Sequence, residues 1–277
     1  MAETLEITSQ VHQALSEDHA HNDVTADLLD PDLRARGEIK VRESVLLCGV
    51  AWVEAVFSQL DENIQIQWHG KDGHFFEADA VICTLEGPAK PLLSGERVAL
   101  NFLQTLSGVA TQTHQYCASL QGTNTKLLDT RKTLPGWRMA QKYAVRCGGG
   151  ENHRLHLADA YLIKENHIIA LGGLAQAVGA ARLAHPDLLL EVEVETLDEL
   201  DQALALGVNR IMLDNFDVPL MREAVVINNG RAKLEASGNI DNSSIAEIAA
   251  SGVDYISVGA LTKHIQAIDF SMRITLQ

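Results

Sequence analysis

Short apolar segments alternate with amphipathic helical segments through the second half of the chain, and this alternation constrains the fold more than any other feature. The strand-like segments are Thr125–Leu128, Ala160–Ile163, Leu188–Val194, Arg210–Leu213, Ala232–Glu235 and Tyr255–Val258. Between them, apolar residues recur with the period of a helix, as in Leu197–Ala205 and Val218–Val226. Repeated strand–helix units of this spacing predict a parallel sheet with helices outside it, arranged as a barrel or a doubly wound sheet.

The first hundred residues lack this repeat and have a mixed α+β pattern. A helix is predicted at Val50–Leu60, and short strands are predicted at Ile64–Trp68 and Ala80–Leu85. A long helix is expected to follow, with Ser94 as its N-cap. Near the end of the chain, Asp269–Leu276 alternates like one more strand, which lies outside the repeat and is able to return to the first domain.

Acidic residues outnumber basic ones by 37 to 22, which gives a formal net charge of −15. A field of this sign repels phosphate backbones and anionic lipids, so neither a nucleic acid nor a membrane surface is an expected partner. The longest uncharged stretch, His167–Ala181, has 15 residues, which is too few to span a bilayer. The N-terminal residues have no secretory signal pattern, and a cytoplasmic location is expected.

Charged residues follow nearly every predicted strand, at the position where a parallel α/β barrel builds its active site. Positive charge gathers at and beside the first three strand ends: Arg131, Lys132, Arg138, Lys142, Arg146, His153, Arg154 and Lys164. In so acidic a chain this cluster indicates an anionic substrate with more than one acidic group. Arg131, Lys132 and Lys164 are preferred as functional residues. The helically spaced Arg138, Lys142 and Arg146 are assigned to a solvated helix or to a supporting role.

The later strand ends carry carboxylates and glycines. Glu191 and Glu193 share one face of their strand because side chains alternate with period 2. Glu193 and Asp214 are candidates to hydrogen-bond sugar hydroxyls, hold a divalent metal or stabilise a developing cation, whereas pairing with an inward lysine is an alternative for Glu191. Ser237-Gly238-Asn239 and Val258-Gly259-Ala260 are candidates for a phosphate cradle. The residues alone thus indicate an enzyme that acts on a phosphorylated sugar and an acidic co-substrate.

Four longer motifs lie at Asn101–Thr111, Asp129–Arg138, Cys147–Arg154 and Ile163–Ile168. Their sequences, above all DTRKTLPG and GGGENHR, closely resemble those of the quinolinate phosphoribosyltransferase family, the carboxylating-named nicotinate-nucleotide pyrophosphorylases. The likeness covers nearly the whole chain in order. It implies an α/β fold with an incomplete barrel of parallel strands at residues 101–267. An N-terminal α/β sandwich domain is implied at residues 1–100, with a C-terminal strand at about 268–277 returning to it.

The resemblance also implies an activity. In this family quinolinate reacts with 5-phosphoribosyl 1-diphosphate to give nicotinate mononucleotide, pyrophosphate and CO₂, a step of de novo NAD synthesis. Mg²⁺ is implied, bound mainly through the diphosphate substrate, and no organic cofactor is implied. A homodimer is implied in which the subunits share each site, with a hexamer of dimers as a further assembly. The lack of a Ser-His or Cys-His signature agrees with a reaction that needs no covalent enzyme nucleophile.

The resemblance assigns roles to residues at both ends of the site. Those expected around the quinolinate carboxylates are Arg131, His153, Arg154 and Lys164. Lys132 is expected between the two substrates, Thr130 belongs to the substrate-binding set, and Arg97 is expected to come from the partner subunit. Glu193 and Asp214 are expected to face the ribose hydroxyls and the metal, and with Lys132 they form the catalytic set. Those expected at the 5′-phosphate are Ser237, Gly238, Asn239, Val258, Gly259, Ala260 and Lys263.

Two positions depart from the family pattern. His156 stands where the family often has glycine, and His21-Asn22 replaces a more usual glycine-rich turn. Two other interpretations stay open. One is a related barrel phosphoribosyltransferase with another acidic base, such as the protein of this family linked to molybdenum uptake. The other is a catalytically silent barrel that senses a phosphorylated metabolite. The dicarboxylate-sized basic cluster favours quinolinate, and the catalytic set favours an enzyme.

Overall fold

The computed structural model describes residues 2–277, and their backbone separates into two units. The first unit contains the chain up to Gln112 together with Pro135–Gly148 and Ile265–Gln277. The second contains Thr113–Leu134 and Gly149–His264. The domain limits taken from the sequence, 1–100 and 101–267, stay a prediction.

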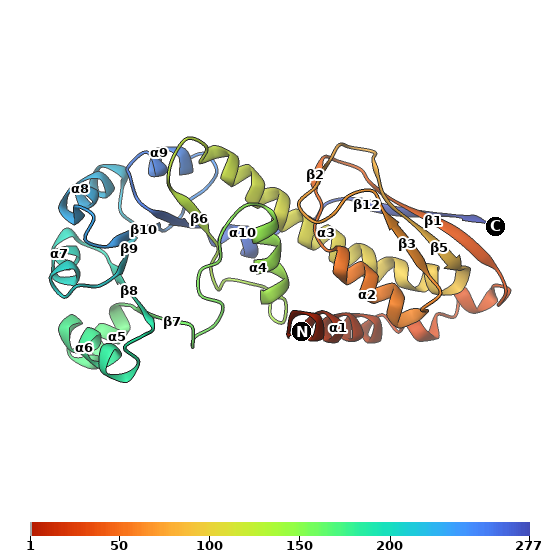
Figure 1. Ribbon diagram of the computed structural model, residues 1–277, viewed down its shortest axis with the longest axis horizontal. Coiled ribbons are helices and arrows are strands. Elements are labelled where there is room, and N and C mark those ends of the chain that lie inside the picture. The colour runs from red at the N-terminus through yellow and green to blue at the C-terminus, as the bar shows by residue number, and fades with distance from the viewer. Residues whose placement is uncertain (1) are drawn as a thin grey trace. The chain divides into compact units, whose positions relative to one another are not determined.

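The first unit is built around a four-stranded antiparallel sheet (Figure 1). In spatial order its strands are β12 (Phe270–Leu276), β1 (Arg34–Val41), β5 (Val81–Pro88) and β3 (Gln65–Trp68). The strands β2 (Val45–Leu46) and β4 (Phe75–Phe76) pair separately. The helices of this unit are α1 (Ala2–Glu17), α2 (Val50–Leu60), the first part of α3 (Ala89–Ser119), α4 (Arg138–Cys147), and two short 3-10 turns at Ala20–Asn22 and Ala26–Leu28. The C-terminal strand therefore does return to the first unit, where it pairs with β1 in antiparallel register.

The predicted start of the long helix was wrong. Helix α3 begins at Ala89, directly after β5, so Ser94 lies inside the helix and not at its N-cap. Pro91 is compatible with this earlier start because the first turn of a helix has no internal partners for its N–H groups. The Ser94 hydroxyl instead donates a hydrogen bond to Oδ2 of Asp23, at 3.0 Å.

The second unit contains six parallel strands, which pair side by side in one sheet (Figure 1). In spatial order they are β6 (Lys126–Leu128), β11 (Tyr255–Ser257), β10 (Lys233–Ser237), β9 (Arg210–Asp214), β8 (Leu189–Val194) and β7 (Ala160–Ile163). The helices are α5 (Glu165–Leu171), α6 (Leu174–Ala184), α7 (Leu197–Ala205), α8 (Val218–Asn228), α9 (Ile245–Ala249) and α10 (Ala260–Lys263). Strands β6 and β7 form the two edges, so the barrel is incomplete, as the resemblance implied.

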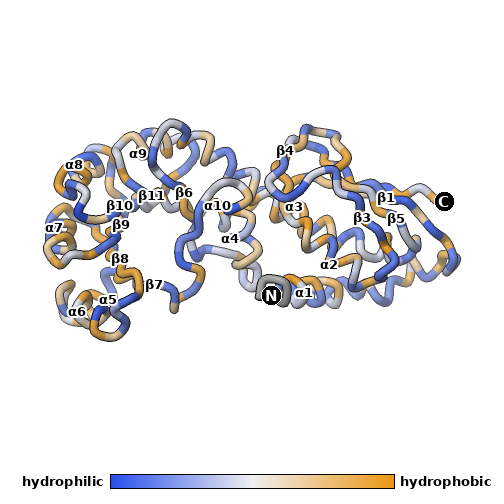
Figure 2. The backbone as a smooth tube through the Cα atoms, in the orientation of Figure 1, coloured by the Kyte–Doolittle hydropathy of each residue, from blue (hydrophilic) through white to orange (hydrophobic). Residues whose placement is uncertain are grey.

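Local sequence explains these strand–helix units. The strands are apolar because both of their faces are covered, and the central residues of β9 are all buried. The helices are amphipathic, with polar residues alternating with apolar ones along them (Figure 2). The side chains of Thr196 and Asp217 accept hydrogen bonds from the backbone N–H groups of Glu199 and Leu220, so they cap α7 and α8. Each helix thus starts at a defined distance after the preceding strand.

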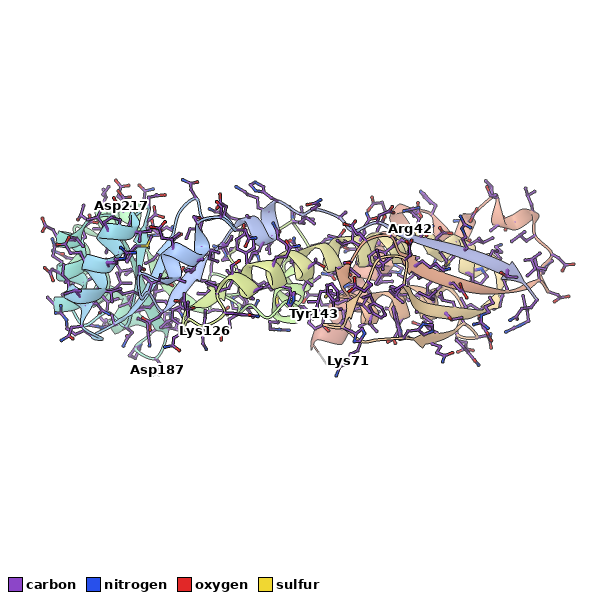
Figure 3. The ribbon with its side chains drawn as sticks, turned by 90° about the horizontal axis from the view of Figure 1, so that it is seen from above. Arg42, Lys71, Lys126, Tyr143, Asp187 and Asp217 are labelled. Carbon is purple, nitrogen blue, oxygen red and sulfur yellow. The ribbon has the colours of Figure 1, made fainter. Side chains whose placement is uncertain are left out.

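The parallel order brings the carboxyl ends of all six strands to one edge of the sheet. Lys126 begins β6 and Asp187 precedes β8, whereas Asp217 follows β9. In Figure 3 Asp217 lies on one side of the second unit, and Lys126 and Asp187 lie on the opposite side. The charged and glycine-containing segments that follow the strands are therefore neighbours in space.

No single helix among residues 2–277 is long and apolar enough to cross a membrane. Helices α5 and α6 reach the required length only as a pair, and the pair is bent by 87° at its break. Leu174, Ala177, Val178 and Ala181 of α6 are buried inside the second unit, whereas Leu183 is exposed.

Candidate active site

Two adjoining cavities lie at the carboxyl ends of the strands of the second unit. The smaller, of about 310 Å³, is lined by Thr130, Arg131, Lys132, His153, Arg154, Leu162, Lys164, Met212, Ser237 and Ser257. The larger, of about 610 Å³, is lined by Thr130, Lys132, Lys164, Glu193, Asp214, Asn215, Ser237, Gly238, Asn239, Ile240, Asp241, Ser257, Val258, Gly259, Ala260, Lys263 and His264. Five residues border both cavities: Thr130, Lys132, Lys164, Ser237 and Ser257. The structure therefore brings together every site residue expected from the sequence except Arg97.

Arg97 lies on α3 in the first unit, with its side chain exposed, and it lines neither cavity. The exposed guanidinium is available to another molecule. Its assignment to a shared site stays a prediction.

The smaller cavity has a cationic wall formed by the ends of β6 and β7 and the segment between them. Arg154 is half-buried, and its Nη1 donates a hydrogen bond to the carbonyl of Ala160 at 3.1 Å. Burial, followed by the charge of Arg131, lowers the pKa of Arg154. Its acidic neighbours in sequence have other partners, since Glu151 pairs with Lys126 at 2.7 Å and Asp159 lies 2.8 Å from Nε2 of His156. This arrangement favours a role for Arg154 toward a ligand over a role in holding the loop.

The basic residues with helical spacing differ from one another in their solvent exposure. Arg146 is exposed and lies over the ring of Tyr143, with 5.7 Å between its Cζ and the ring centroid. Lys142 is fully buried, so its assignment to a solvated helix was wrong. The spacing placed these residues on one helix correctly, but the solvent exposure of a side chain depends on what packs against that helix.

The larger cavity carries the acidic residues. The carboxylate of Glu193 forms an ion pair with Nζ of Lys164, and its side chain is 12% exposed. Asp214 accepts a hydrogen bond from Nδ2 of Asn215 at 2.8 Å. Both residues line the larger cavity, and carboxylate oxygen is the ligand atom that Mg²⁺ prefers.

Glu191 does not pair with an inward lysine. It is fully buried, and its Oε2 lies 3.0 Å from Nε2 of His153. His153 does border the smaller cavity, but its two ring nitrogens contact protein groups: Nδ1 accepts a hydrogen bond from the backbone N–H of Arg154 at 2.8 Å. The expected contact between His153 and a substrate carboxylate stays a prediction.

The glycine-bearing segments approach their neighbours closely. Gly238 has φ +107°, and a Cβ placed there would lie 2.2 Å from Oδ1 of Asn215. Asn215 and Asn239 also have positive φ, at 57° and 47°, so the backbone bends sharply at this corner of the cavity. A Cβ on Gly259 would lie 3.0 Å from Cδ of Lys132. A side chain at either position would therefore meet its neighbours, and both glycines line the larger cavity, where a phosphate cradle is expected.

The departure at position 156 leaves the loop intact. The backbone of His156 does not adopt a positive φ, so no glycine is required there. Its Nδ1 accepts a hydrogen bond from the backbone N–H of Ala158 at 3.2 Å, and the side chain is exposed.

Several residues of the site were missed from the sequence. Asn215 and Ser257 directly adjoin predicted site segments, and their polar side chains were an available signal. Glu235 is fully buried beside His153 and Glu191. The period-2 alternation of β10 places Glu235 on the same face as Ser237, which would have identified it.

Comparison with known proteins agrees with this arrangement. The family models of the quinolinate phosphoribosyl transferase N-terminal and C-terminal domains match residues 23–107 and 109–273. The chain is 41% identical over 273 residues to a probable nicotinate-nucleotide pyrophosphorylase [carboxylating] of Bacillus subtilis, covering 98% of this chain and 94% of the relative.

Solved structures give the same result. The nicotinate-nucleotide pyrophosphorylase from Francisella tularensis is 49% identical, with a TM-score of 0.96 over 98% of this chain and 97% of that one. NadC from Streptococcus pyogenes is 38% identical, with a TM-score of 0.95 over 99% and 98% of the two chains. From both family models, the near full-length identity and the matching fold, the chain belongs to the quinolinate phosphoribosyltransferase family.

Proposed function

We propose that this protein transfers the phosphoribosyl group of 5-phosphoribosyl 1-diphosphate to quinolinate. The products are nicotinate mononucleotide, pyrophosphate and CO₂, and the reaction serves NAD biosynthesis. The observation that carries the proposal is the pair of adjoining cavities, one with a cationic wall and one bordered by carboxylates and glycine segments. Family membership supplies the identity of the two substrates.

The smaller cavity suits a pyridine dicarboxylate. Arg131 and Arg154 offer planar guanidinium groups that match a carboxylate with two hydrogen bonds, and Lys164 adds a compact charge. Leu162 and Met212 supply an apolar surface for the ring. The carboxylates and the ring of the substrate are thus recognised by different residues of the smaller cavity.

The larger cavity suits the phosphoribosyl donor. The backbone around Gly238 and Gly259 is open to the 5′-phosphate, with Lys263 nearby. Glu193 and Asp214 face the ribose, where their negative charge stabilises the oxocarbenium-like state that forms as C1 loses pyrophosphate. Lys132, which borders both cavities, is the cation at the point where the substrates meet.

The chemistry requires no covalent enzyme nucleophile. The C1–O bond to pyrophosphate breaks, and the pyridine nitrogen supplies the electron pair of the new C1–N bond. The nitrogen is then quaternary and accepts electron density when the 2-carboxylate leaves as CO₂. The enzyme's part is to hold the nitrogen against C1 and to stabilise charge in the transition state.

Turnover is expected to require Mg²⁺ because the diphosphate is the main ligand of the ion. Glu193 and Asp214 offer oxygen atoms that would assist in holding it, and the ion would neutralise charge on the departing pyrophosphate. Enzyme treated with EDTA and then freed of it should be inactive until Mg²⁺ is added. Full activity without an added divalent ion contradicts this requirement.

A homodimer with shared sites is proposed from the family resemblance, which assigns Arg97 to the site of the partner subunit. An inactive Arg97→Ala protein mixed with an inactive Lys164→Ala protein should regain partial activity once the subunits exchange. Each hybrid dimer then contains one site with both residues intact. Exchange demonstrated by mass spectrometry without any recovered activity would count against sharing. A cytoplasmic location stays a prediction from the sequence.

The function is tested by assaying quinolinate against nicotinate with the same phosphoribosyl donor. Nicotinate has one carboxylate, so it forms fewer charged contacts with the cationic wall. Formation of nicotinate mononucleotide and CO₂ from quinolinate, with nicotinate a poor substrate, supports the proposal. Preference for another acidic base favours a related phosphoribosyltransferase, and binding without turnover favours a sensor.

A further inference from the structure

Two cysteines of the first unit lie close together although they are far apart in the sequence. Cys48 directly precedes the N-cap of α2, and Cys147 is the last residue of α4. Their Sγ atoms and a carboxylate oxygen of Asp72 lie within 4.8 Å of one another. Cys48 is fully buried, whereas Cys147 is partly exposed, so a small molecule in solution meets Cys147 first.

One carboxylate fixes the segments that carry both cysteines. Oδ1 of Asp72 accepts hydrogen bonds from the backbone N–H groups of the two residues that follow Cys48, at 3.0 and 3.1 Å. Oδ2 accepts a hydrogen bond at 2.7 Å from the hydroxyl of Tyr143, which lies one turn before Cys147 on α4 and is labelled in Figure 3. Hydrogen bonds on both sides therefore hold the two sulfurs near each other.

The two cysteines differ in how firmly their backbone is held. The N–H of Cys48 donates a hydrogen bond to Oγ of Ser107 at 3.0 Å, and the Ser107 hydroxyl donates one to the carbonyl of Cys48, also at 3.0 Å. Cys147 ends its helix and is followed by Gly148-Gly149-Gly150, whose backbone has wide conformational freedom. Cys147 is therefore the partner that is able to move to the distance of a sulfur–sulfur bond, about 2 Å.

The arrangement suits a bond between the two sulfurs better than a bound metal ion. Asp72 already accepts three hydrogen bonds, so its oxygens would have to lose partners to hold a cation. Two thiolates alone are too few for a structural site of a thiophilic ion such as Zn²⁺, which takes four ligands. A disulfide needs only the two sulfurs and leaves the hydrogen bonds of Asp72 in place.

We propose that Cys48 and Cys147 are a modification site at which a peroxide forms a reversible intramolecular disulfide. The thiolate of Cys147 attacks a peroxide oxygen, so an S–O bond forms and the O–O bond breaks. The hydroxide that leaves takes up the proton that Cys147 had released. The sulfur of Cys48 then attacks the sulfenic acid of Cys147, an S–S bond forms, and the departing hydroxide takes the thiol proton of Cys48. Two thiols and one hydrogen peroxide thus give one disulfide and two water molecules.

The surroundings of the four thiols support Cys147 as the one that attacks. A side-chain hydrogen bond with Cys48 is the main reason why the pKa of Cys147 lies below its ordinary value, although burial acts against it. Burial raises the pKa of Cys48 well above its ordinary value. Burial also raises the pKa of Cys83 to about 12 and that of Cys117 to about 11, so these thiols are less reactive.

Peptide mapping of the full-length protein tests the proposal without any assay of turnover, so its outcome is independent of the proposed function. Protein treated with hydrogen peroxide is alkylated with N-ethylmaleimide and digested without reductant. The free thiols should fall from four to two per chain, with one peptide pair joined through Cys48 and Cys147. Dithiothreitol should restore all four. A link from Cys147 to Cys117, or four thiols that all stay free, overturns the proposal.

Single variants separate the roles of the two cysteines. In Cys48→Ala, dimedone should trap a sulfenic acid on Cys147, because the second sulfur is absent. In Cys147→Ala, Cys48 should stay a thiol at the same peroxide dose, because it is fully buried. Cys117→Ala is the matched control, since Cys117 is also partly exposed, and it should form the disulfide at an unchanged rate. Oxidation of Cys48 in Cys147→Ala, or slowed disulfide formation in Cys117→Ala, overturns the assignment.

Metal analysis separates the disulfide from an ion site on the same sulfurs. Reduced protein is incubated with Zn²⁺, freed of unbound ion by gel filtration and compared with Cys147→Ala. A zinc content that is the same in both proteins supports the proposal. One zinc ion per chain that is lost in Cys147→Ala overturns it, because the thiols then serve as metal ligands.

Discussion

Arg154→Ala should lower kcat/KM for quinolinate by about 30-fold to several thousand-fold, because truncation of one partner of a buried charged pair costs about 2–5 kcal/mol. Arg154 borders the smaller cavity, and its acidic neighbours in sequence are engaged with Lys126 and His156. The KM for the phosphoribosyl donor should change much less, since its phosphate is proposed to bind at the glycine segments. Steady-state kinetics with each substrate varied in turn measure both effects.

Two variants control this result. Arg154→Lys should restore little activity, because an ammonium group cannot reproduce the planar two-pronged contact of a guanidinium. Arg222→Ala removes an exposed arginine of α8 that lines neither cavity, and it should leave both KM values unchanged. A stably folded Arg154→Ala enzyme with unchanged kcat/KM for quinolinate would refute the assignment. Loss of thermal stability with equal effects on both substrates would instead indicate a role in holding the loop.

Gly238→Ala should raise the KM for the phosphoribosyl donor by about 10- to 100-fold, since each charge-assisted hydrogen bond to a phosphate contributes about 1.5–3 kcal/mol. Its Cβ would lie 2.2 Å from Oδ1 and 3.0 Å from the backbone nitrogen of Asn215, so the corner of the larger cavity must move. The φ of +107° adds strain of its own. The KM for quinolinate is expected to change less, because Gly238 itself lines the larger cavity and not the smaller one.

Gly252→Ala is the matched control for backbone strain. Gly252 also has a positive φ, at 95°, but a Cβ there meets only Val225, at 3.4 Å, and the residue lines neither cavity. Gly252→Ala should therefore lose stability without a change in the KM for the donor. If both variants change that KM equally, the effect of Gly238→Ala is general strain and not loss of a phosphate site.

The repeat of strands and helices could be predicted from the sequence because its signals are local. Apolar period and capping residues act within a few positions, and they defined Val50–Leu60, Leu197–Ala205 and Ala160–Ile163 to the residue. Parallel strands of one sheet present their carboxyl ends at the same edge. The positions of Lys132, Lys164 and the other strand-end residues in the sequence were therefore enough to predict that they lie in one region.

The start of α3 and the burial of Lys142 were not predictable in this way. A favourable N-cap residue is found at Ser94, but β5 delivers the chain into a helix five residues earlier, and the serine hydroxyl bonds to Asp23 instead. A favourable N-cap residue stabilises a helix by about 1 kcal/mol, and tertiary packing readily overrides a contribution of this size. Lys142 has the spacing of a solvated helix face, yet the fold encloses it completely.

By itself the sequence determined which residues follow which strand, because strand and helix periods are properties of neighbouring residues. Only the tertiary structure decided which of these side chains meet. Glu191 and Glu235 are 44 positions apart on strands separated by β9, and they converge on His153 through the curvature of the incomplete barrel. Period 2 gives the face on which a side chain lies, whereas its distance from a side chain two strands away depends on strand order and curvature, which are set by the packing of the whole unit.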